Sequence, residues 1–101
     1  MPATSDIFRR YLHRVFVETG THDGDGCVAA LAAGYEEVYS IEAGRDLYEQ
    51  CVARFKNETR VHIVLGGSEV ELARVLDLVR EPATIWLDAH SAFGDMIPGT
   101  D

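Results

Sequence analysis

The sequence predicts an α/β fold in which a Rossmann-like parallel sheet of about four strands has helices on both faces. Apolar runs and amphipathic segments alternate four times along the chain, which is the order of elements in a parallel sheet with right-handed crossovers. A glycine-rich turn follows the first apolar run, and the second run ends on an acid, Glu42. Such a turn and acid are typical of a site for a nucleotide-like ligand at the carboxyl edge of a sheet.

Four apolar runs are expected to form the strands. They occupy residues 15–19, 37–42, 61–65 and 83–88. The first run is apolar on both faces, so it belongs in the interior of the sheet. Glu81 and Pro82 end the helical segment that precedes the fourth run, because proline cannot continue a helix.

The N-terminal segment and the segment after the glycines favour the first two helices. Ser5 or Asp6 can cap a short helix that continues through about His13. Its apolar stripe consists of Ile7, Phe8, Tyr11 and Leu12. Residues 27–33 are small, which lets the second helix lie close to the sheet, and Gly34 is typical of a helix end.

Two further helices are expected after the second and third runs. The third helix has apolar residues at helical spacing, namely Leu47, Tyr48, Cys51, Val52 and Phe55. The fourth begins at Ser68, because Ser68 and Glu71 have the spacing of a capping box. Its expected buried side consists of Leu72, Val75, Leu76 and Val79.

Length, charge and cysteine content limit the function. A chain of 101 residues corresponds to one domain, residues 1–101. Because 17 acidic residues face 9 basic ones, nucleic acid and anionic membranes are not expected as partners. Neither a signal peptide nor an apolar run of ~18 residues is seen, which predicts a cytoplasmic protein. Cys27 and Cys51 lie among apolar helical residues and are expected to be buried free thiols.

Acids surround the glycine-rich turn. Gly20 and Gly24 can adopt positive φ and let a ligand approach the backbone. Glu18 precedes the turn, and Asp23 and Asp25 lie within it. Acids next to a helix N-terminus disfavour a diphosphate, so a cationic or neutral ligand fits better. The alternative is a tight turn whose glycines serve geometry alone.

The turn and the acid after the second run together resemble a known family. A carboxylate at the position of Glu42 can accept both ribose hydroxyls of an adenosyl group, although a solvated acid is the alternative. The motif Glu18-x-Gly20-x-His22-x-Gly24, completed by Glu42, resembles the cofactor half of class I S-adenosylmethionine-dependent methyltransferases. The resemblance covers residues 14 to about 95 and implies half of a seven-stranded methyltransferase fold.

The resemblance also implies a role for each residue of the motif. Gly20 and Gly24 would wrap the methionine part of S-adenosylmethionine, and Glu42 would take the ribose hydroxyls. Glu18 would orient the amino-acid end of the cofactor. His22 stands where the family more often has glycine, so its side chain must either point away from the cofactor or touch it.

The chain departs from the family pattern at two further places. Gly67 occupies the position of an acid that meets the adenine amino group, so that contact would come from Ser68, a backbone group or water. Three of the seven strands are absent, which makes the chain a short, apparently truncated relative.

The resemblance implies that the end of the fourth run faces the acceptor. Asp88 could hold Mg²⁺ or position an amine or hydroxyl, and His90 could remove a proton at neutral pH. Asp95 is a candidate third oxygen ligand. The alternative is that Asp88 caps the following loop and His90 is solvated.

Methyl transfer from S-adenosylmethionine to an O or N acceptor, a small molecule, is the leading hypothesis for function. One alternative is a cofactor-binding module without methyl transfer. Another is an NAD-dependent oxidoreductase, which the acid-rich turn disfavours. A homo-oligomer through the fourth strand is expected, because the resemblance leaves that apolar run as an open edge. The alternative is that residues 91–101 fold over this edge.

Overall fold

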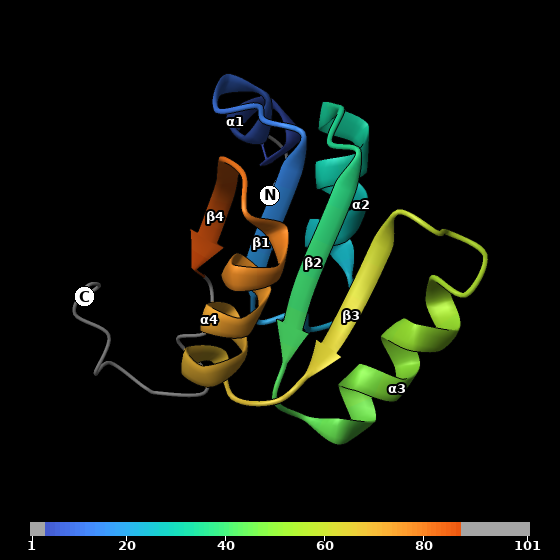
Figure 1. Ribbon diagram of the computed structural model, residues 1–101. Helices are drawn as coiled ribbons and strands as arrows, with labels where there is room; N and C mark the ends of the chain where they lie inside the picture. The colour runs from blue at the N-terminus through green and yellow to red at the C-terminus, as the bar shows by residue number, and fades with distance from the viewer. Residues whose placement is uncertain (1–3, 88–101) are drawn as a thin grey trace.

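The computed structural model describes residues 4–87, which form one four-stranded sheet with helices on both faces (Figure 1). The strands run parallel in the order β3-β2-β1-β4. They are β1 (Val15–Thr19), β2 (Glu37–Glu42), β3 (Val61–Leu65) and β4 (Ala83–Leu87). The helices are α1 (Thr4–Arg10), α2 (Asp25–Ala33), α3 (Arg45–Arg54) and α4 (Ser68–Val79). The predicted fold class and order of elements are confirmed.

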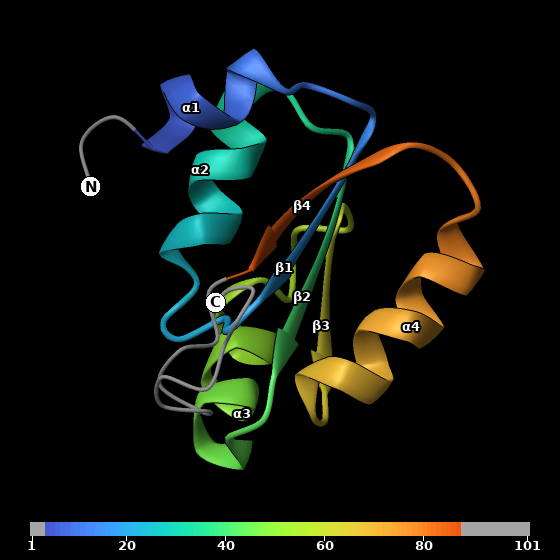
Figure 2. The ribbon, with the colours of Figure 1, turned by 90° about the vertical axis from the view of Figure 1, so that its left-hand side faces the viewer.

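The sheet separates two apolar layers. Helices α1, α2 and α3 lie on one face, and α4 lies on the other (Figure 2). Phe16 of β1 belongs to one core with Phe8 of α1 and Cys27 of α2. Val17, the next residue of β1, packs in the other core with Val75 of α4. Because successive strand residues point to opposite faces, β1 is buried on both sides, as its apolar run predicts.

Polar contacts hold the end of the sheet where β1 and β4 begin. The Tyr35 hydroxyl lies 2.7 Å from the Phe8 carbonyl oxygen and 2.9 Å from the Thr84 hydroxyl, so it joins α1 to β4. Arg14 donates two hydrogen bonds, of 3.0 and 2.8 Å, to the two carboxylate oxygens of Glu81. This bidentate bond lowers the pKa of the Glu81 carboxyl.

Helix α1 differs from its prediction in extent and in burial. It begins at Thr4, so Ser5 and Asp6 lie in its first turn, and it ends at Arg10, before His13. Of the expected apolar stripe, Phe8 is buried. The other members are exposed: Ile7, Tyr11 and Leu12.

Helix α4 lacks the predicted capping box. Gly67 is the N-cap residue and Ser68 is already helical, and no side-chain capping bond forms. A capping box requires serine or threonine at the N-cap itself. On the buried side, Val75, Leu72 and Val79 pack against the sheet as expected, whereas Leu76 is exposed.

Strand β4 lies at one edge of the sheet, as expected. Within residues 4–87 it pairs with β1 alone. The side chains of Ile85 and Leu87 are 42% and 61% exposed. The described part of the chain therefore presents an apolar strand edge.

The helices of residues 4–87 are all short. The longest, α4, has 12 residues, and none of those described is both long enough and apolar enough to cross a bilayer.

Candidate cofactor-binding site

A cavity of about 580 Å³ lies where β1 and β4 end and α2 begins. Its volume is within the range of small-molecule sites. The glycine-rich turn forms one side with the carboxylate-bearing residues Glu18, Asp23 and Asp25. Phe8 and Trp86 form another side, with their rings edge to face and 5.0 Å between centroids. The cavity is therefore negatively charged at one end and aromatic at the other.

The turn over this cavity uses the left-handed backbone region three times. Gly20, His22 and Gly24 have φ of 84°, 54° and 98°. The Gly20 amide donates a 2.8 Å hydrogen bond to the carbonyl of Ile41, which ties the turn to β2. At Gly24 a side chain is excluded from the α3 side, because a Cβ would lie 2.7 Å from the Phe55 ring. Gly24 thus allows α3 to approach the turn and does not line the cavity.

His22 adopts the conformation that glycine adopts most easily, and a hydrogen bond holds it there. Its backbone amide donates a 2.8 Å bond to Oε1 of Glu42. Oε2 of Glu42 accepts a 2.9 Å bond from the amide of Gly44. The Glu42 side chain is 8% exposed. This carboxylate therefore joins the glycine-rich turn to the β2–α3 turn.

Glu18 is buried beneath the first turn of α2. Its Oε2 accepts a 2.6 Å hydrogen bond from the Ser40 hydroxyl, and the Cys27 thiol donates to the same oxygen at 3.4 Å. The Ser40 hydroxyl is also 2.6 Å from the hydroxyl of Thr21. A Cβ on Gly26 would overlap the Glu18 carboxylate. Glycine at position 26 therefore lets the positive end of α2 lie directly over this acid.

Arg54 of α3 holds the outer side of the turn. It donates a 2.5 Å bond to the carbonyl of Asp23 and lies 3.3 Å from the carboxylate of Asp25. The partial charge at the start of α2 is positive, so Asp25 in the first helical turn is also favourable. The acids of the turn thus have structural partners as well as contact with the cavity.

Cys27 and Cys51 are buried free thiols, as expected. Burial raises the pKa of both thiols, and the nearby Glu18 carboxylate raises that of Cys27 further. The Cys51 thiol donates a 3.2 Å bond to the carbonyl of His22, so it supports the same turn.

Both thiols should therefore resist alkylation in the folded protein. A raised pKa keeps each thiol protonated at neutral pH, and the thiolate is the reactive form. Iodoacetamide, followed by mass spectrometry, should leave Cys27 and Cys51 unlabelled in native protein and label both in concentrated guanidinium chloride. Fast labelling of either cysteine in the native protein would contradict this burial.

The predicted cofactor-binding residues fall into three groups. Glu18, Gly20 and His22 line the cavity together. Gly24 and Glu42 support the turn from the side of α3 and do not line the cavity. Ser68 begins α4 after β3 and also lies outside the lining.

The catalytic and metal candidates Asp88, His90 and Asp95 lie outside the described residues. Within residues 4–87, no group of three or more His, Cys, Asp or Glu side chains could hold a metal ion. The expectation of Mg²⁺ rested on Asp88 and stays a prediction.

Sequence reasoning missed four contributors to the site, Phe8, Thr21, Ser40 and Trp86. Trp86 both packs on Phe8 and lines the cavity. The available signal for Ser40 was a serine inside the apolar run 37–42, and the structure pairs it directly with Glu18.

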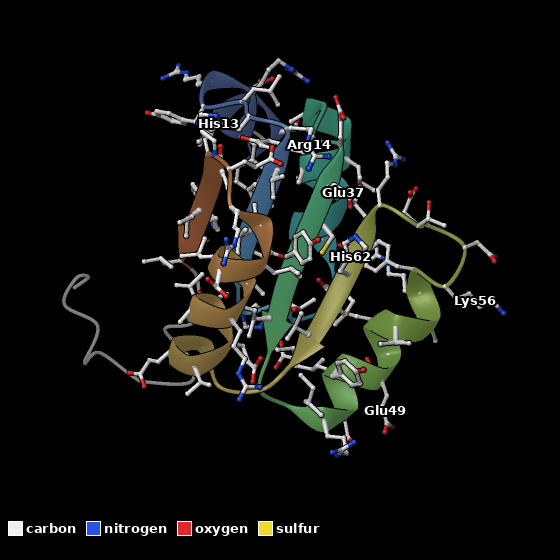
Figure 3. The ribbon with its side chains drawn as sticks, in the orientation of Figure 1. His13, Arg14, Glu37, Glu49, Lys56 and His62 are labelled. Carbon is white, nitrogen blue, oxygen red and sulfur yellow. The ribbon has the colours of Figure 1, made fainter. Side chains whose placement is uncertain are left out.

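His62 has two partners, Glu37 and Tyr39. Its Nε2 is 2.7 Å from the Glu37 carboxylate, and its ring stacks on Tyr39 with 4.6 Å between centroids. Figure 3 shows Glu37 and His62 side by side on β2 and β3. His62 thus stabilises the pairing of these strands, which agrees with a structural role.

Comparison with known proteins supports the fold. Neither a protein-family model nor a curated protein matches the sequence. A solved structure that does match is that of Arabidopsis thaliana protein arginine methyltransferase 10 in an open conformation, with a TM-score of 0.56 and 22% identity. The match covers 68% of this chain and 22% of that chain. Residues of this chain therefore adopt a fold that forms part of a known methyltransferase.

Proposed function

We propose that the chain is the donor-binding half of an S-adenosylmethionine-dependent methyltransferase. The observation that carries this proposal is the cavity at the carboxyl end of β1, where Gly20 and His22 of the turn meet the buried acid Glu18. The methyltransferase fold supports it independently. In open α/β sheets, ligands bind at the carboxyl ends of the strands, where this cavity lies.

The charge of the cavity favours this ligand over a dinucleotide. Three acidic residues, Glu18, Asp23 and Asp25, are among the residues that line the cavity. The positive amino group and positive sulfur of S-adenosylmethionine outweigh its single carboxylate, so such a lining attracts the molecule. A diphosphate would be repelled, so NAD fits this cavity poorly.

Glu42 retains the capacity to bind a ribose. Each of its oxygens accepts one backbone amide, and a carboxylate oxygen can accept two hydrogen bonds. Two acceptor positions are therefore left for two ribose hydroxyls. The Gly66 amide donates a 3.0 Å bond to the Glu42 carbonyl, which brings the β3–α4 turn next to the end of β2. Ser68 follows that turn and is proposed to meet the adenine.

S-adenosylmethionine supplies an electrophilic methyl group on a positively charged sulfur. The residues of this chain align it, and alignment with exclusion of water is most of what in-line transfer requires. Asp88 and His90 follow β4 directly in sequence. They are proposed to face a small-molecule O or N acceptor, with Asp88 positioning it or holding Mg²⁺ and His90 accepting its proton.

Calorimetric titration tests the donor site. S-adenosylmethionine and S-adenosylhomocysteine should both bind with one site per chain, whereas NAD should give no heat of binding. Binding of NAD without binding of either adenosyl compound would reject the proposal.

A binding module without methyl transfer is the second candidate. The glycine-rich turn over the cavity and the Glu42 carboxylate that holds it would serve cofactor binding alone, because methyl transfer needs an acceptor site in addition. Transfer of labelled methyl from S-adenosylmethionine to amine and hydroxyl acceptors distinguishes the two. Binding without transfer to any acceptor would favour the module.

We further propose that the β4 edge pairs with a second copy of the chain. An apolar strand edge without charges tends to pair with another strand, and residues 83–87 carry none. Light scattering should show a dimer that dissociates on dilution, and Ile85→Lys should give a monomer, because lysine on an edge strand opposes pairing. A wild-type protein that is monomeric at every concentration would contradict this.

A further inference from the structure

The turn, β2 and β1 are joined by a buried chain of side-chain hydrogen bonds. Ser40 has one hydroxyl proton, and it donates this proton to Oε2 of Glu18 at 2.6 Å. In its 2.6 Å contact with Thr21, Ser40 must therefore accept, and Thr21 donates. The series of hydrogen bonds runs from Thr21 through Ser40 to Glu18, and all three side chains are buried.

This series of hydrogen bonds sets the position of the Glu18 carboxylate, and Glu18 is one of the residues that line the cavity. Glu18 and Ser40 are direct partners in the parallel β1–β2 register, so their side chains lie on the same face of the sheet. An O–H···O⁻ contact of this length is a charge-assisted bond, about twice as strong as a neutral one. A buried acid held in this way has less freedom to rotate away from a ligand.

We propose that Thr21 and Ser40 are positioning residues that orient Glu18 toward the protonated amino group at the amino-acid end of the ligand, and so determine specificity for that end. This inference rests on the proposed function, because it takes S-adenosylhomocysteine as the ligand. Thr21 and Ser40 act through Glu18 and need not touch the ligand.

Two ligands separate positioning from general support of the site. S-adenosylhomocysteine contains both the adenosyl group and the amino-acid end, whereas 5′-methylthioadenosine keeps the adenosyl group and the sulfur but lacks the amino-acid end. Thr21 precedes His22, whose amide binds the Glu42 carboxylate proposed for the ribose. Damage to the turn as a whole would therefore lower the affinity for both ligands.

The experiment measures the affinity of Thr21→Val, Thr21→Ser and Ser40→Ala for both ligands by calorimetry. Thr21→Val keeps the shape but removes the proton donor, and Thr21→Ser keeps the donor. Thr21→Val and Ser40→Ala each break the charge-assisted network, so each should lower the affinity for S-adenosylhomocysteine about tenfold. Binding of 5′-methylthioadenosine should be unchanged, and Thr21→Ser should bind both ligands like the wild type.

Each outcome bears on one proposal in particular. The positioning role would be overturned if Thr21→Val lowered the affinity for both ligands equally. It would also be overturned if a folded Thr21→Val protein bound both ligands like the wild type. Either result would leave the proposed donor site intact. If Ser40→Ala does not fold, the comparison of Thr21→Val with Thr21→Ser decides alone. A wild-type protein that binds neither ligand would overturn the proposed function and the inference with it.

Discussion

Glu42→Ala should weaken the binding of S-adenosylhomocysteine by at least about tenfold. Each hydrogen bond from a ribose hydroxyl to this carboxylate should contribute on the order of 1.5–3 kcal/mol, and about 1.4 kcal/mol is a factor of ten. The substitution also removes the acceptor of the His22 and Gly44 amides, which hold the turn in place. Calorimetry on the variant and the wild type measures the loss.

Two variants make this result specific. Glu42→Gln keeps one acceptor oxygen, so it should fall between Glu42→Ala and the wild type. Glu49→Ala is the matched control, because Glu49 is an exposed acid of α3 that pairs at 3.8 Å with Arg45 on the same helix. Glu49→Ala should bind normally. A folded Glu42→Ala protein with unchanged affinity would show that this acid does not bind the ligand.

Gly26→Ala should lose both stability and ligand binding. The added Cβ would overlap the Glu18 carboxylate, with the carboxyl carbon 3.2 Å away. Either α2 must move off the sheet or Glu18 must leave its hydrogen bonds with Ser40 and Cys27. Overpacking of this kind costs about 1–3 kcal/mol in the free energy of unfolding, which denaturant titration measures.

Gly67→Ala is the control for this prediction. A Cβ on Gly67 meets no atom within 4 Å, and its φ of −73° suits any residue. Its free energy of unfolding should change by less than about 1 kcal/mol, since the effects on the helix cap and on the unfolded chain oppose each other. A Gly26→Ala protein as stable as Gly67→Ala, with normal ligand affinity, would mean that α2 does not need to approach Glu18 closely.

The fold could be predicted because apolar periodicity determines which segments are strands and helices. The run 15–19 begins with three apolar residues in a row, and it forms the strand that is buried on both faces. Helix ends were less predictable, because they depend on one residue. Ser68 and Glu71 have the spacing of a capping box, but Gly67 takes the N-cap position, so the box does not form.

The site residues at the end of the first strand were predictable, because their place in the sequence determines where they lie in a parallel sheet. Glu18 lies near the end of the first strand and Gly20 directly follows it, and the parallel sheet places both at its carboxyl edge. The contact of Gly24 with Phe55 was not predictable, because it depends on how α3 packs against the turn. The role of Ser40 likewise depends on the β1–β2 register, which the sequence pattern does not specify.

Nuclear magnetic resonance of the ¹⁵N-labelled chain, titrated with S-adenosylhomocysteine, locates the donor site residue by residue. We expect amide signals to shift in the turn, residues 20–26, and after β2, residues 42–44, because the turn lines the cavity and the Glu42 carboxylate binds the amides of His22 and Gly44. A second cavity, of about 370 Å³, lies beside α3 and β3, with Val52 and Ile63 in its lining. Shifts confined to this second cavity, or no shifts at all, would contradict a donor site at the glycine-rich turn.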